Sequence, residues 1–150
     1  MTAREPSAQV PMTASNVRQV RLEWTGEGLA FRGGREGGSH VGVDSSGEIG
    51  PSPMEMLLLS VAGCMAIDIL MILEKSRVPV ASLALDAIGV RAESVPKRYT
   101  SVKLVCRVSG PSEEDESKVV RAVELSRDKY CSVLHTLDPQ IDFEIQVERS

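Results

Sequence analysis

The feature that most constrains this chain is an apolar stretch at residues 50–73, GPSPMEMLLLSVAGCMAIDILMIL. Met56–Leu73 contains one charged residue, Asp68, and is just long enough to cross a membrane. Asp68 would then lie deep in hydrocarbon, Ser60 and Gly63 dilute the apolar run, and no basic or aromatic anchors flank it. The rest of the chain also predicts strands that need a helix to cover them. We therefore interpret the stretch as the core helix of a protein that does not span a membrane.

The start of this helix is marked by its own residues. Ser52 suits the N-cap position, Pro53 the first helical position, and Glu55 lies three residues after the cap, which together form a capping box. The helix should end near residue 75 or 76, because Pro79 disfavours helical backbone just ahead of it.

Alternating apolar residues predict strands on both sides of the helix. In the first of them Val20, Leu22 and Trp24 alternate with polar residues, which predicts a half-buried strand. The expected order is βββ-α-ββ-αα-β, an α+β fold in which a long central helix is covered by an antiparallel sheet. The strands are expected over 17–24, 28–33, 39–44, 80–93, 99–110 and 141–147, and the later helices over 112–130, capped by Ser112, and 130–137. A loose tail at 1–16 precedes a single domain at 17–150.

Composition narrows the function classes. With 150 residues and a net charge of −4, the chain has no basic run and few aromatic residues, so neither nucleic acid nor a membrane is an expected partner. Three cysteines, an odd number, argue against the disulfide framework of a secreted protein, and we expect a cytoplasmic location. Their spacing resembles neither a CxxC motif nor a zinc site, and His40 and His135 are the only imidazoles, so no metal is expected.

The three cysteines have different settings. Cys106 alternates with Val102, Leu104 and Val108 in its strand and is interpreted as a core residue. Cys64 lies within the long helix, where periodicity alone favours packing over reactivity. Asp68, one turn later, would raise a thiol pKa, so a reactive Cys64 would need a cation from elsewhere in the fold.

Cys131 lies at the junction of two predicted helices, in a polar setting of Lys129, Tyr130 and Ser132. The start of a short helix favours a thiolate. The spacing of 67 residues does not say whether Cys131 meets Cys64.

Two segments, each with one cysteine, together resemble a known protein family. GPSPMEMLLLSVAGCMAIDILMIL and ELSRDKYCSVLHTL resemble the OsmC/Ohr family of osmotically inducible and organic hydroperoxide resistance proteins, in particular its OsmC-like, YhfA-type branch. The resemblance extends over roughly residues 17–147, and the order of elements agrees.

The resemblance implies an intertwined homodimer and a thiol peroxidase that reduces organic hydroperoxides, and hydrogen peroxide less well. By position Cys64 would be oxidised to a sulfenic acid and Cys131 would resolve it as a disulfide. The resemblance also implies that no cofactor is bound and that an external dithiol, of lipoyl type or another small thiol, is the reductant. The alternative is a non-catalytic OsmC-like dimer that binds a small apolar ligand.

The sequence departs from the family pattern around the thiol. Well-characterised members have a Glu directly after the helix-opening proline, paired with an Arg from the N-terminal region. Here Met54 follows Pro53, and Glu55 is one place later, which turns its side chain by about 100° around the helix. Arg32 and Arg35 lie in the region of the expected Arg, and Arg98 is a third candidate. The candidate residues that would support the reactivity of Cys64 are therefore Arg35, Arg32, Glu55 and Asp68.

Overall fold

The computed structural model describes residues 16–150. Contacts within one chain group them into two compact units, the first ending at Ser52 and the second spanning Pro53–Ser150. The tail predicted at 1–16 lies, apart from Asn16, outside the described residues, and the single domain at 17–150 stays a prediction.

The first unit is a meander of three antiparallel strands, with the order β1-β2-β3. The strands are β1 Arg21–Trp24, β2 Ala30–Gly34 and β3 His40–Asp44. All residues of β1 are exposed in the single chain, Leu22 and Trp24 included. The prediction that this strand is half-buried is therefore wrong for the single chain. The physical reason is that the described residues of this unit, 16–52, include no helix that could cover either face of its sheet.

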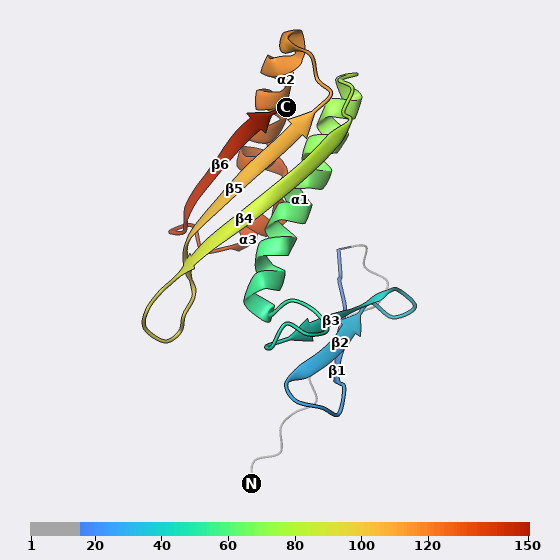
Figure 1. The fold of residues 1–150 in the computed structure, drawn as a ribbon, viewed down its shortest axis with the longest axis vertical. Coiled ribbons are helices and arrows are strands. Elements are labelled where there is room, and N and C mark those ends of the chain that lie inside the picture. The colour runs from blue at the N-terminus through green and yellow to red at the C-terminus, as the bar shows by residue number, and fades with distance from the viewer. Residues whose placement is uncertain (1–15) are drawn as a thin grey trace. The chain divides into compact units, whose positions relative to one another are not determined.

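The second unit is a sheet with helices on one face (Figure 1). The helix α1 runs from Pro53 to Lys75, as the sequence predicts. The sheet has the order β4-β5-β6, with β4 Ser82–Arg91, β5 Tyr99–Ser109 and β6 Asp142–Arg149. Strands β4 and β5 are antiparallel, whereas β5 and β6 are parallel, so the sheet is mixed and not antiparallel throughout. A parallel pair needs a crossover, and the later helices provide it.

The crossover from β5 to β6 contains four short helical pieces. They are a 3-10 turn η1 at Glu113–Asp115, α2 at Glu116–Leu125, a π-helical turn η2 at Ser126–Tyr130, and α3 at Ser132–Thr136. The predicted order βββ-α-ββ-αα-β is confirmed, with the two turns added. Ser112 does precede the first turn, but its hydroxyl caps no backbone amide and donates instead to the Asp115 carboxylate.

The core lies between the sheet and the helices. The inward face of β5 is fully buried, as the alternation predicts, and consists of Val102, Leu104, Cys106 and Val108. On α1 the buried side consists of Val61, Ala62, Met65, Ile69 and Leu73. Burial raises the pKa of the Cys106 thiol to about 11, which fits the inert core role predicted for it.

The other side of α1 is also apolar, and it is exposed. It carries Leu59, Ile67, Leu70 and Met71. By length and composition alone α1 could cross a membrane, and 28% of its most apolar window is buried within the chain. One side of α1 is therefore buried in the core, as the sequence predicts. The other side is an exposed apolar surface.

Candidate active site

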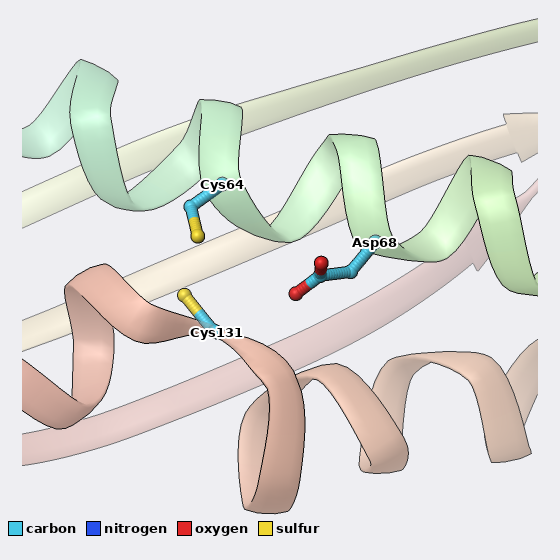
Figure 2. Close-up of side chains that lie close together, drawn as sticks. All are labelled: Cys64, Asp68 and Cys131. Carbon is cyan, nitrogen blue, oxygen red and sulfur yellow. The ribbon is translucent and has the colours of Figure 1, made fainter. Parts of the chain in front are cut away.

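The centre of α1 and the crossover bring two cysteines and one carboxylate together. Cys64 and Asp68 lie one turn apart on α1, so their side chains point to the same side of the helix. Cys131, between η2 and α3, faces them (Figure 2). The two Sγ atoms and a carboxylate oxygen of Asp68 all lie within 4.8 Å of one another. Both thiols are free, and bond formation would require the sulfurs to approach to about 2.05 Å.

The π-helical turn η2 fixes this meeting point. The Cys131 amide donates to the Ser126 carbonyl oxygen at 2.8 Å, which closes the wide turn directly before Cys131. The fully buried Ser126 hydroxyl donates to Oδ2 of Asp68 at 2.8 Å and thereby orients the carboxylate. One contact thus ties α1 to the turn that positions Cys131.

Ser126 is a site residue that the sequence reasoning missed. Its signal is present in the printed sequence, because Ser126 continues the buried stripe of Val119, Ala122 and Val123 at helical spacing. A serine on such a stripe needs a buried hydrogen-bond partner, and Asp68 is that partner.

The environment of Cys131 differs from the prediction. Lys129, Tyr130 and Ser132 are exposed, but the thiol between them points inward and is fully buried. Its Sγ accepts a hydrogen bond from the Leu134 amide at 3.4 Å, as expected at a helix start. Burial nevertheless dominates and raises the pKa of Cys131 to about 11, with smaller contributions in the same direction from Cys64 and Asp68. The predicted preference for thiolate is therefore wrong, since α3 has only five residues and cannot offset desolvation.

Cys64 is more accessible than Cys131. Its side chain is half-buried and packs against the apolar cluster that contains Cys131, Val61 and Met65. The Cys64 side chain therefore packs against the core and is also partly accessible to solvent. Cys64 is therefore the more accessible of the two thiols to a small reagent.

Of the other candidate supporting residues, Glu55 and Arg98 belong to the second unit, and Arg32 and Arg35 belong to the first. Glu55 precedes Cys64 by nine positions, about 13 Å along the helix axis, so its carboxylate does not touch the thiol of the same α1 helix. Arg32, in β2, and Arg35, in the turn after it, belong to the first unit, and their supporting role stays a prediction. Arg98 forms an ion pair with Asp138, with 3.6 Å between Nη1 and Oδ2.

Near the start of α1 the second unit has a pocket of about 440 Å³. Its apolar walls are Met54, Leu57, Tyr99, Leu137 and Ile141, and its charged residues are Arg91, Lys97, Arg98 and Asp138. The apolar walls belong to the cluster that also contains Cys64 and Cys131. Leu57 precedes Cys64 by seven positions, so the pocket begins about two helical turns, roughly 10 Å, from the thiol.

Tyr99 shapes this pocket and anchors the helix beside it. Its hydroxyl donates to the Met54 carbonyl oxygen at 2.7 Å. Its ring fills the space where a side chain at Gly89 would lie, so the neighbouring strand requires glycine there.

The family model described as "OsmC-like protein" matches residues 44–146 of this chain. The chain belongs to the OsmC-like family. Protein YhfA of Escherichia coli K12 is 39% identical over 125 residues, which cover 83% of this chain and 92% of that protein. The resemblance to the OsmC/Ohr family and the α+β fold with a long central helix are thus confirmed, and the homodimer stays a prediction.

Solved structures agree with this assignment. A hypothetical protein from Aquifex aeolicus VF5 has 31% identity and a TM-score of 0.77, with 89% of this chain and 96% of that chain covered. An organic hydroperoxide resistance protein from Elizabethkingia anophelis shares the fold at 10% identity, with a TM-score of 0.63 and coverage of 93% and 100%.

Proposed function

We propose that this OsmC-like protein is a thiol-dependent peroxidase that reduces organic hydroperoxides, and hydrogen peroxide less well. The observation that carries the proposal is the pair of free cysteines, Cys64 and Cys131, whose sulfur atoms lie within 4.8 Å of each other. The family includes proteins named for organic hydroperoxide resistance, which supports this reading of the pair. The site of action is cytoplasmic, with no nucleic acid or membrane as partner.

The first step would use Cys64. Its thiolate attacks the outer oxygen of the hydroperoxide, the O–O bond breaks, and the alkoxide takes up a proton and leaves as an alcohol. Cys64 is then a sulfenic acid. Half-burial of Cys64 suits this role, since the peroxide has to reach the sulfur.

The second step would use Cys131. Its sulfur attacks the sulfenic sulfur of Cys64, a disulfide forms, and the hydroxyl group leaves as water after taking the proton of the Cys131 thiol. An external dithiol, of lipoyl type or another small thiol, then restores both thiols by exchange.

The pocket beside α1 supports organic hydroperoxides as substrates. Burying an alkyl chain stabilises a complex by about 25 cal/mol per Å² of apolar surface, and hydrogen peroxide has no such surface to bury. Leu57, one of its apolar walls, lies on α1 roughly 10 Å along the helix axis from Cys64, so the pocket would hold the far end of a long alkyl chain whose peroxide group is at Cys64.

The exposed side of α1 supports the homodimer. Leu59, Ile67, Leu70 and Met71 form an apolar strip on a helix whose opposite side is already covered by the sheet. A contiguous apolar strip of this kind marks an interaction surface, and a second copy of α1 offers a matching one.

Ile67→Glu is expected to convert the dimer to a monomer, because it places a charge in the middle of the strip, where Ile67 is 61% exposed in one chain. Sedimentation equilibrium measures the change. Ile88→Glu is the matched control, because Ile88 is 53% exposed on β4, outside the strip. A monomeric wild type, or equal dissociation of both variants, would contradict the proposal.

The peroxidase proposal is tested with the reduced wild-type protein. We expect multiple turnovers of cumene hydroperoxide with a dithiol, and the loss of two of the three free thiols per chain when the dithiol is omitted. Peptide mapping should find the new disulfide between Cys64 and Cys131, with Cys106 still reduced. A rate equal to that of the dithiol alone would refute the peroxidase.

The same experiment separates the second candidate, a non-catalytic dimer that binds a small apolar ligand. The pocket of about 440 Å³ is the observation that favours it. Absence of turnover together with a small apolar molecule found by native mass spectrometry of the purified protein would select this function.

A further inference from the structure

The three side chains of the site also have the composition of a metal site, although they come from positions with no metal-site spacing. Cys64, Asp68 and Cys131 offer two sulfur ligands and one oxygen ligand, all within 4.8 Å of one another. In a tetrahedral zinc site with Zn–S distances of about 2.3 Å, two sulfur ligands lie roughly 3.8 Å apart. The present separations therefore need an inward movement of no more than about 1 Å to surround an ion.

The hydrogen bonds around the three ligands are those that hold metal ligands in place. The Ser126 hydroxyl donates to Oδ2 of Asp68, which orients the carboxylate and leaves it lone pairs for an ion. The Leu134 amide donates to Sγ of Cys131, an arrangement that stabilises negative charge on the sulfur. Both donors belong to the crossover, so one segment orients a ligand on α1 and a ligand of its own.

The chemistry of the ligands selects the ion. Two thiolates and one carboxylate suit zinc, whereas magnesium and calcium prefer sites made of oxygen alone. Three protein ligands leave the fourth tetrahedral position for water, as in zinc sites that are open to solvent. The ion would enter past Cys64, which is only half-buried.

We propose that the reduced protein binds one zinc ion per chain through Cys64, Cys131 and Asp68. Binding is independent of the proposed peroxidase activity, because it needs only the two thiols and the carboxylate. It requires the release of the thiol protons, so affinity should increase with pH. The spacing of the cysteines in the sequence predicts no metal site. The proposal is based instead on the distances between the three ligand atoms in the folded chain.

One consequence rests on the proposed function. A sulfur bound to zinc has its lone pair engaged and attacks a peroxide poorly, so zinc and hydroperoxide would compete for Cys64. The disulfide form lacks both sulfur ligands, so only the reduced protein would hold the ion. Zinc would act here as an inhibitor of the reduced site.

The test uses the full-length protein, reduced and freed of metal under anaerobic conditions, and needs no peroxide. Zn²⁺ is titrated against a chromogenic chelator, and Cd²⁺ is used in parallel because its thiolate bonds give a charge-transfer absorption. We expect one ion per chain, a cadmium–thiolate band, and at least about a 100-fold loss of affinity in both Cys64→Ser and Cys131→Ser. Asp68→Asn should weaken binding by about 10-fold to 100-fold.

Cys106→Ser is the matched control and should leave binding unchanged, because Cys106 is buried in a different apolar cluster, with Ile69, Leu73 and Val108. Ser126→Ala is a second variant that keeps all three ligands, and a weaker affinity there would reflect the loss of carboxylate orientation. Circular dichroism establishes that each variant is folded before its titration is interpreted. Absence of one tight ion in the wild type, or an affinity unchanged in folded Cys64→Ser or Cys131→Ser, would overturn the proposal.

Discussion

Cys64→Ser is expected to lower the rate of cumene hydroperoxide reduction to that of the dithiol alone. A serine hydroxyl has an oxygen in place of the sulfur that becomes a sulfenic acid, so the first step has no acceptor for the peroxide oxygen. No other thiol can take over, because Cys131 and Cys106 are both fully buried. Turnover is measured by loss of hydroperoxide at a fixed dithiol concentration.

Cys106→Ser provides the matched control for this loss. It removes one thiol by the same change, from a residue that belongs to a different apolar cluster. Its rate should equal that of the wild type if the protein remains folded, which circular dichroism establishes. A substantial rate in Cys64→Ser, or an equal loss in folded Cys106→Ser, would contradict the assignment of Cys64 as the attacking thiol.

Much of the fold follows from residue patterns in the sequence. The boundaries of α1 follow from Pro53 at its start and Pro79 beyond its end, and the inward face of β5 follows from the alternation around Cys106. These features are local, so a single sequence contains them. The parallel pairing of β5 with β6 was missed because it depends on the path of the chain through the crossover.

The site could be predicted only in part, because it is formed by contacts between distant positions. Periodicity alone assigned Cys64 to packing, and only the match of two segments to a family suggested its partner Cys131. The π-helical turn at Ser126–Tyr130 was not predicted, since its pattern is hard to separate from an ordinary helix. That turn decides which way Cys131 points, so the burial of its thiol was misjudged as well.

The burial of Cys131 is expected to make the rate of disulfide formation with the Cys64 sulfenic acid strongly dependent on pH. Disulfide formation from Cys64 sulfenic acid is expected to become about tenfold faster for each pH unit between pH 6 and pH 9. The pKa of Cys131 is raised to about 11, mainly by burial, so its thiolate fraction rises tenfold per unit at any pH well below that value. At neutral pH the Cys131 thiol is therefore almost entirely protonated.

The measurement is a single turnover with one equivalent of hydroperoxide, in which dimedone labelling at timed intervals follows the sulfenic acid of Cys64. Cys131→Ser is the control: the sulfenic acid of Cys64 should persist at every pH, since this variant has no second thiol beside Cys64. Asp68 also faces Cys131 and contributes to its raised pKa, so Asp68→Asn should shift the profile slightly toward lower pH. A rate that does not change with pH would mean that resolution is not limited by ionisation of Cys131. The buried thiol would then have to gain its thiolate through a change in structure that follows oxidation of Cys64, and the crossover from Ser126 to Thr136 is the segment that would move.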